Sequence, residues 1–111
     1  MARLNLGRFE AIDWDSDDDE EGNLIHCLRH GIDEIVVDEV ISEDPIDLKM
    51  EPKTAEFAIV GPNRERNMMW TLLFDVSDKR GDWLRPVTGW RSEISEIREW
   101  EQAMKKKWRR R

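Results

Sequence analysis

The feature that most constrains the fold of this chain is a change in the period of its apolar residues. In "MMWTLLFDV", residues 68–76, apolar residues recur at every second position on one face, which is typical of a β-strand. That face holds Met68, Trp70, Leu72, Phe74 and Val76. From Ser92 the period changes to 3.6, and the apolar stripe holds Ile94, Ile97, Trp100, Met104 and Trp108. The sequence therefore predicts a sheet followed by an amphipathic helix.

Three further segments predict strands around that one. They are "PIDLKME" (45–51), "EFAIVG" (56–61) and "DWLRPVT" (82–88). The turns "GPNRERN" and "SDKRGD" between them have lengths suited to antiparallel hairpins. Because Pro86 has no N–H to donate to a ladder, we expect it at a sheet edge or at a bulge.

Two helices are expected before the sheet, after a short strand around Phe9 to Trp14. Ser16 is the expected N-cap of the first helix, with the acidic run in its first turn, and Gly31 is its expected left-handed end. Its apolar stripe would hold Leu24, Ile25 and Leu28.

The second helix is expected to start at the cap residue Asp33 and to stop at Pro45. Its inward-facing residues would be Val36, Val37, Val40 and Ile41. The β-branched residues among them leave a strand open as an alternative.

Together these elements predict an α+β fold: two N-terminal helices, an antiparallel sheet of about four strands and a C-terminal helix packed on the sheet. A length of 111 residues suits one domain spanning residues 1–111. We expect a frayed N-terminus at about residues 1–8 and a basic tail at about residues 105–111 that also frays.

Charge is distributed unevenly between the two halves of the chain. Residues 1–60 carry 5 Lys+Arg against 17 Asp+Glu, a net charge of −12, and residues 61–111 carry 13 against 8, a net charge of +5. The halves can pair with each other, or the basic half can present a cationic face to phosphate or to an oppositely charged partner. The sequence leaves these alternatives open.

Several classes of site are not supported by the residues present. A single cysteine, Cys27, excludes an intramolecular disulfide framework and a multi-cysteine zinc site, and it favours the cytoplasm. No segment has the apolar core of a signal peptide or the roughly 18 apolar residues of a membrane helix, so we expect no membrane partner. No serine stands in a nucleophile elbow, and the acidic run lacks the glycine and closing glutamate of a calcium loop.

His26 and His30 are spaced to share one face of the first helix. They suit a metal pair, although no third strong ligand lies nearby in the sequence, and a histidine next to a glycine, as His30 is, more often caps a helix C-terminus. We therefore expect no metal or other cofactor.

Arg85 and Arg91 flank the join between the last strand and the final helix. They are six residues apart across an expected turn, so their side chains would converge beside the N–H groups of the helix start, which is an arrangement that binds phosphate. Thr88 would add a hydroxyl, and Trp83 or Trp90 a surface for stacking a base. The alternative is that the arginines pair with carboxylates and the tryptophans belong to the core.

A series of short motifs follows in order along the chain: "WD", an acidic helix with "N", "RHGI", "DEV", "EDP" and finally "RGDWLRPVTGWRSEISEIREWE". This order resembles the BrnT family, the toxins of bacterial type II toxin–antitoxin systems, over about residues 9–101. The matching positions are Trp14, Asp15, Asn23, His30, Gly31, Ile32, Glu39, Val40, Asp44, Pro45, Arg85, Thr88, Arg91, Glu96, Trp100 and Glu101.

The resemblance implies a RelE-like fold, a ribonuclease that arrests growth by cutting RNA, and a ribbon-helix-helix antitoxin as partner. Cleavage of this kind uses the 2′-hydroxyl as nucleophile and needs no metal, so the protein must position the phosphate, stabilise its charge and supply an acid or base. By side-chain chemistry, Arg85 and Arg91 would stabilise charge, and His30 or Glu39 would be the acid or base. Thr88, Trp90 and Trp83 would contact RNA.

The chain departs from the family pattern where Trp90 replaces a usual arginine and where Glu56 replaces an arginine in the strand near Ala55. An alternative interpretation is therefore a catalytically degenerate BrnT-like protein, a protein-binding or regulatory module whose acidic half meets a basic partner. A third is nucleic-acid binding through the tail "KKKWRRR".

Overall fold

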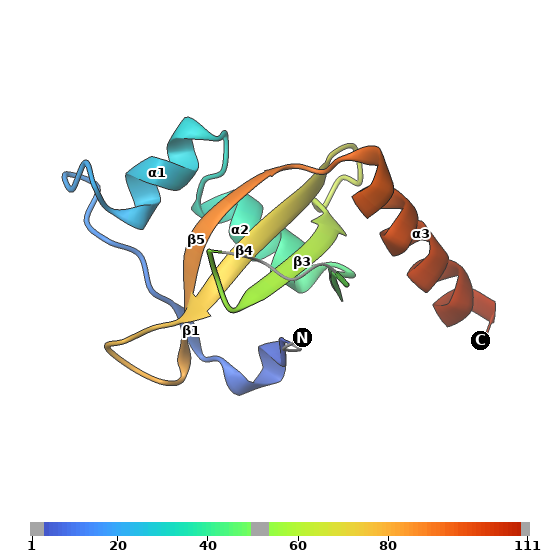
Figure 1. The fold of residues 1–111 in the computed structure, drawn as a ribbon, viewed down its shortest axis with the longest axis horizontal. Coiled ribbons are helices and arrows are strands. Elements are labelled where there is room, and N and C mark those ends of the chain that lie inside the picture. The colour runs from blue at the N-terminus through green and yellow to red at the C-terminus, as the bar shows by residue number, and fades with distance from the viewer. Residues whose placement is uncertain (1–3, 50–53, 110–111) are drawn as a thin grey trace.

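The computed structural model describes residues 4–49 and 54–109. In chain order its elements are η1 (Leu6–Arg8), β1 (Ala11–Ile12), α1 (Asn23–Arg29), α2 (Glu34–Ser42), β2 (Ile46–Asp47), β3 (Phe57–Pro62), β4 (Met69–Val76), β5 (Trp83–Arg91) and α3 (Ile94–Arg109). This is the predicted α+β fold, with two N-terminal helices and a C-terminal helix packed on a sheet (Figure 1).

Within the described residues the sheet has five strands, in the order β1-β5-β4-β3-β2. Neighbours from β2 to β5 are antiparallel, as the sequence predicts. The fifth strand, β1, is parallel to the start of β5, with Ala11 opposite Trp83, and it keeps two residues of the strand expected around Phe9 to Trp14. Residues 50–51 of another expected strand lie outside the described residues.

Pro86 lies at a β-bulge, as expected. Leu73 pairs with Thr88 and Phe74 with Pro86, which leaves Val87 as the extra residue of β5. The bulge shifts the alternation of the strand. Arg85 and Thr88, although three residues apart, therefore point to the same face of the sheet.

Helices cover both faces of this sheet. α1 and α2 pack on one face over the main core, and α3 packs on the other face near one end (Figure 1). The main core holds Cys27, Ile32, Val37, Val40, Phe57, Ile59, Trp70, Leu72, Phe74 and Leu84. Trp100 of α3 packs against the second, smaller core. The alternation of β4 explains the division, because Leu72 faces the first core and Leu73 the second.

α1 begins later than the sequence predicts. Its N-cap is Gly22, and the Ser16 hydroxyl donates to the Asp18 carboxylate instead of capping a helix. The expected start at Ser16 is wrong because the Asp15 carboxylate accepts the N–H of Asn23 and so takes the role of a capping group there. The acidic run before it forms turns.

The core-facing side of α1 also differs from the expected stripe. Leu24 and Cys27 are buried, whereas Leu28 is 46% exposed and Ile25 is half-buried. The helix is seven residues long, and its buried face runs through Leu24 and Cys27. Leu28 therefore points toward solvent. Gly31 follows the helix with φ of 79°, which confirms the predicted left-handed end.

α2 is a helix, so the strand alternative is wrong. The Asp33 carboxylate accepts the N–H of Val36 at 2.8 Å, which confirms the predicted N-cap. Val37 and Val40 are fully buried, and Val36 and Ile41 are half-buried against the main core. The expected inward face is confirmed.

α3 packs through a narrower face than the 3.6 period predicts. Met104 and Glu96 are buried and Trp100 is half-buried, but Ile94 is 68% and Trp108 is 52% exposed. The placement of Ile94 and Trp108 on the inner face is wrong because they stand at the two ends of the helix, whereas the buried Glu96 and Met104 and the half-buried Trp100 lie between them.

The described parts of the two expected frayed ends are ordered. Leu4 and Leu6 pack against the main core, and residues 6–8 form η1. α3 continues through Lys105 to Arg109. Residues 1–3 and 110–111 of these ends lie outside the described residues.

Candidate functional site

Arg85, the first residue expected to bind phosphate, is held by two carboxylates of the acidic half. Its Nη1 and Nη2 donate to the two oxygens of Asp15 at 3.0 and 2.6 Å, and Nη1 also lies 3.4 Å from Asp13 Oδ2. The planar guanidinium and the carboxylate thus pair through two bonds, the strongest geometry for such ions. For Arg85, the alternative of pairing with the acidic half is confirmed.

Asn23 connects this ion pair to the surrounding elements. The N–H of Asp15 donates to Asn23 Oδ1, and the N–H of Asn23 donates to Asp15 Oδ2, both at 2.8 Å. Nδ2 of Asn23 donates to the backbone oxygens of Asp13 and Pro86. We name Asp13, Asp15, Asn23 and Arg85 the Arg85 joint, because they join the end of β1, the start of α1 and β5.

The charges of the Arg85 joint stabilise each other. Hydrogen bonds from Arg85, and then from the backbone of Asn23, lower the pKa of Asp15 to about 2. The hydrogen bond to Asp15 in turn raises the pKa of Arg85. A phosphate that approached this guanidinium would have to displace a firmly ionised carboxylate.

Asp13 is the buried member of the joint, with 2% of its surface exposed. Its Oδ2 accepts from the Ser77 hydroxyl at 2.7 Å, and Lys79 Nζ lies 3.5 Å from its Oδ1. A buried carboxylate requires such partners, since an unpaired charge is costly away from water. Asp13 therefore ties the turn after β4 to the joint.

The structure does not bring Arg85 and Arg91 together. Both belong to β5, which runs as one strand from Trp83 to Arg91, so about 20 Å of extended chain separates them. The expected convergence across a turn is wrong because the strand continues to the start of α3. Arg91 is exposed at the far end of β5, opposite Trp70.

His30 and Glu39 lie at two further places. His30 is exposed at the C-cap of α1, and its ring centroid lies 4.9 Å from that of His26. Glu39 lies on α2, and its Oε1 accepts the N–H of Arg64 in the turn after β3. The sheet register places that turn at the opposite end of the sheet from Arg85. The four expected catalytic residues do not share a site.

His26, to which the sequence assigned no catalytic role, reaches the expected RNA-contacting residue Thr88. Its Nε2 lies 3.1 Å from the Thr88 hydroxyl. His26 and Arg85 line one hollow of about 350 Å³, together with Asp75. Within residues 4–49 and 54–109, no group of three His, Cys, Asp or Glu side chains is placed to hold a metal ion.

Trp90 has its hydrogen-bonding capacity used inside the fold. Its Nε1 donates to Glu96 Oε1 at 3.0 Å, and its ring packs against the second core. The same oxygen accepts the Thr71 hydroxyl at 2.9 Å and the N–H of Glu93 at 2.8 Å, the latter a capping-box contact. Trp90 therefore acts with Glu96 to fix the start of α3.

Trp83 lies at the opposite end of β5 from Trp90. Its ring is half-buried, and the Arg80 guanidinium lies 5.3 Å from the ring centroid. Its backbone pairs with Ala11 of β1. The two tryptophans expected to stack bases thus do not form one surface.

Ion pairs join the acidic and basic halves at a second place, the end of α2. Arg66 and Lys107 lie 2.7 and 2.6 Å from the Asp44 carboxylate, and their hydrogen bonds, first that of Lys107, lower the pKa of Asp44. Trp100 Nε1 donates to the backbone oxygen of Asp44 at 2.6 Å, which ties α3 to this corner. Here too the halves of the chain pair internally.

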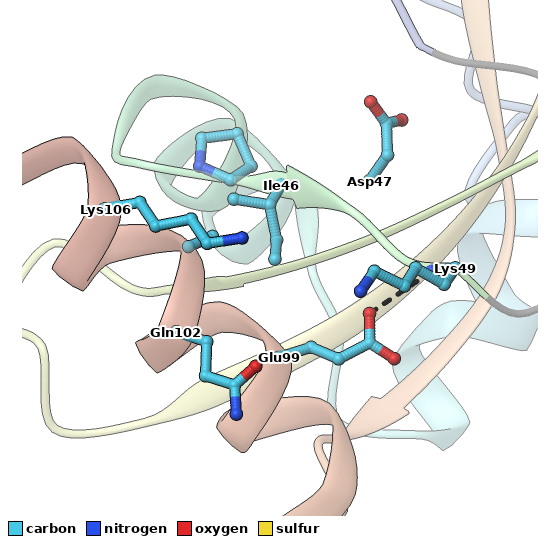
Figure 2. A pocket seen from close by; sticks show the side chains of 8 residues that line it. Ile46, Asp47, Lys49, Glu99, Gln102 and Lys106 are labelled. Carbon is cyan, nitrogen blue, oxygen red and sulfur yellow. Dashed lines mark hydrogen bonds between the residues drawn. The ribbon is translucent and has the colours of Figure 1, made fainter.

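A groove of about 430 Å³ separates β2 from α3 (Figure 2). Lys49 and Lys106 extend into it from the two sides, and Glu99 and Gln102 face it from α3. Glu99 accepts the N–H of Lys49 at 3.2 Å. None of the expected catalytic residues, and none of Thr88, Trp90 and Trp83, lines this groove, whereas Lys106 of the basic tail does.

Sequence reasoning missed the Arg85 joint as a unit. Asp15 and Asn23 match the family pattern, but the sequence assigns them no role, and it does not single out Asp13. The available signal was two aspartates around the end of the predicted strand, Asp13 within it and Asp15 directly after it, and an asparagine in the helix predicted to follow. Both are features of buried or capping polar groups.

Comparisons with known proteins add no relative, because no family model, curated protein or solved structure matches this chain. No helix in the described part of the chain is long and apolar enough to cross a membrane.

Proposed function

We propose that this chain is a catalytically degenerate BrnT-like protein, a protein-binding module that keeps the antitoxin-type partner and lacks ribonuclease activity. The observation that carries the proposal is the pairing of Arg85 with Asp15. Affinity for phosphate comes chiefly from cations. This guanidinium donates through both terminal nitrogens to a carboxylate whose pKa is about 2, so its charge is already compensated.

The distribution of the other expected groups supports the same proposal. Cleavage of one phosphodiester requires a cation and an acid or base within reach of the same phosphate. Arg91 lies about 20 Å along β5 from Arg85. Glu39 lies at the other end of the sheet and bonds to the backbone of Arg64. These residues are placed to serve the fold separately.

The surface around α1 has the character of a site for a basic protein partner. The acidic run 17–21 is exposed, and Leu28 of α1 and Ile35 of α2 are 46% and 65% exposed. Carboxylates beside apolar side chains complement a partner that presents cations around an apolar centre. A ribbon-helix-helix antitoxin, which the resemblance implies, is the partner that we propose.

One observation favours the ribonuclease as a second candidate. His26, Arg85 and Asp75 line the same hollow, and His26 contacts the hydroxyl of Thr88. An imidazole beside a guanidinium is a plausible acid–base and charge-stabilising pair for RNA cleavage. In that case His26 would take the role that the sequence assigned to His30.

Cleavage assays distinguish these two candidates. We expect the purified full chain to leave RNA intact and its induced expression in bacteria to leave growth unchanged. Growth arrest with RNA cleavage that His26→Gln abolishes, at unchanged thermal stability, would overturn the proposal in favour of the ribonuclease. His30→Gln is the matched control, because its ring adjoins that of His26 but does not contact Thr88.

The partner is tested by co-expression with the product of the neighbouring reading frame. We expect co-purification of a small ribbon-helix-helix protein, weakened by Asp18→Lys or Leu28→Ser. Glu101→Lys is the matched control, since Glu101 is an exposed acid on α3, away from the proposed surface. Equal weakening by the control would contradict a partner site around α1.

A further inference from the structure

The end of α3 carries cations that the fold leaves unpaired. Earlier in the basic half, the cations that form ion pairs are Arg64, Arg66, Lys79, Arg80 and Arg85. From Arg91 onward, Lys107 is the one cation of the described residues within an ion pair. Lys105, Lys106 and Arg109 are exposed and have no carboxylate partner in the described chain.

Nothing in the same stretch of helix offsets these charges. The last carboxylate in the sequence is that of Glu101, one turn before Lys105. Met104 is the last buried residue of α3, and among the described residues after it only Lys107 forms an ion pair, with Asp44. The final turns therefore present a local cationic surface on a protein with a net charge of −7.

Trp108 gives this cationic surface an aromatic ring. It is 52% exposed and belongs to neither core. Lys105 precedes it by three residues, a spacing that places the two side chains side by side on a helix, and Arg109 follows it directly. An exposed indole flanked by cations is suited to a base that stacks on the ring while its phosphates meet the cations.

Other anions fit this surface less well. An acidic peptide would use the cations but gives the indole no flat ring to stack on. A lipid surface requires a continuous exposed apolar stripe, whereas the other exposed apolar residue of this helix, Ile94, lies at its opposite end. A nucleic-acid duplex keeps its bases stacked on each other and so withholds them from Trp108.

We propose that Lys105, Trp108 and Arg109 form a binding surface for single-stranded nucleic acid. The surface is separate from the Arg85 joint. It rests neither on the partner nor on the absence of cleavage proposed above.

The test is a fluorescence-anisotropy titration of the full chain with a labelled short oligouridylate and with the matching oligothymidylate. The variant Lys105→Gln/Arg109→Gln should bind at least about tenfold more weakly. Because each phosphate contact on a single strand contributes about 0.7 to the slope of log affinity against log salt, this variant should lower the slope by about 1.4. Trp108→Ala should weaken binding about tenfold through the loss of stacking.

Arg29→Gln is the matched control, since Arg29 is an exposed cation on α1 without an ion pair among the described residues. It should change affinity less than about twofold. A preference for one of the two oligonucleotides identifies the natural strand as RNA or DNA, and equal affinity for both also supports the proposal. All four substituted side chains are exposed, so the melting temperature should stay unchanged.

Three results would overturn the inference. The first is no binding of the oligonucleotides by the unmodified chain, or equal losses for Arg29→Gln and Lys105→Gln/Arg109→Gln. The second is full affinity in Trp108→Ala together with displacement by polyglutamate of matched charge, which would reveal a cation patch without base recognition. The third is binding to vesicles of anionic lipid but not to either oligonucleotide.

Discussion

The Arg85 joint and the end of α3 use the same kinds of charged side chain in opposite ways. At the joint, Arg85 donates to carboxylates of the other half of the chain, 70 residues away in the case of Asp15. At the end of α3, Lys105 and Arg109 are exposed to solvent without such partners. The charge asymmetry of the sequence thus divides into a part that assembles the fold and a part that is free for a ligand.

The difference teaches that a cation indicates a phosphate site only once its carboxylate partners are known. Arg85 lies on the strand beside β1, and this places it next to Asp13 and Asp15. Lys105 lies on the last turns of α3, where the Asp44 carboxylate of the acidic half pairs with Lys107 and no described carboxylate pairs with Lys105. Position in the fold, and not residue type, separates the two roles.

The largest effect on stability is expected from a substitution that breaks the Arg85 joint. Arg85→Ala should lower the free energy of unfolding by about 3 kcal/mol, because it leaves Asp15 with a partly buried, uncompensated charge and Asp13 with Lys79 as its one remaining described cation. Arg98→Ala on the exposed face of α3 should change it by less than about 0.5 kcal/mol. Urea unfolding of the two variants measures the contrast, and equal losses would remove the distinction between the regions.

A second variant separates the inner face of α3 from its outer face. Glu96→Ala should cost about 2 kcal/mol of unfolding free energy, because the Thr71 hydroxyl, the Trp90 indole and the Glu93 N–H lose their shared acceptor. Glu101→Ala, one and a half turns further along, should be near neutral. Thermal unfolding followed by circular dichroism compares them, and a neutral Glu96→Ala would show that water replaces the lost acceptor.

Acid should weaken the joint in a defined window. The pKa of Asp15 is about 2 in the folded chain against an ordinary value of 3.8, so the unfolded chain binds the proton first. Its contribution to stability is complete above about pH 4 and is lost as the pH falls toward 2. Asp15→Asn should therefore lose less stability than the unmodified chain across this window in urea titrations. Asp44 contributes equally to both proteins, so a parallel loss would mean that Asp15 carries no such contribution.

The smallest effect is expected at the exposed ion pair of α3. Lys107→Ala should cost only about 0.5 kcal/mol, since the Lys107 side chain is 46% exposed and such pairs are screened. High salt should abolish this cost while it leaves most of the cost of Arg85→Ala. A larger, salt-insensitive loss for Lys107→Ala would place this pair in the same class as the joint.

Much of the fold follows from local signals in the sequence. The alternation of Met68 to Val76, the capping carboxylate of Asp33 and the glycine at position 31 each act within a few residues, so they predict β4, α2 and the end of α1. The pairing of Ala11 with Trp83 could not be predicted in this way, because a parallel strand of two residues has no sequence pattern that identifies a distant partner strand. The exposure of Ile94 and Trp108 could not be predicted, because the period of apolar residues does not show which turns of a helix contact the sheet.

The site was less predictable than the fold for the same physical reason. The sequence identifies Arg85 as a cation on the last predicted strand and Thr88 as a hydroxyl three residues later. Which of the 17 acidic residues in the first half would meet Arg85 depends on the closure of β1 against β5. The contact of His26 with Thr88 likewise depends on how α1 packs beside the bulge at Pro86. This packing cannot be predicted from any single residue.

The distance in sequence between Asp15 and Arg85 has a consequence for the order of folding. A contact across 70 residues must close a long loop, whereas β3, β4 and β5 are linked by short turns and can pair early. The joint therefore forms late, and its loss should accelerate unfolding more than it slows folding. Asp15 and Arg85 would then set the lifetime of the native state, with the opening of β1 and α1 as the first event when that state is lost.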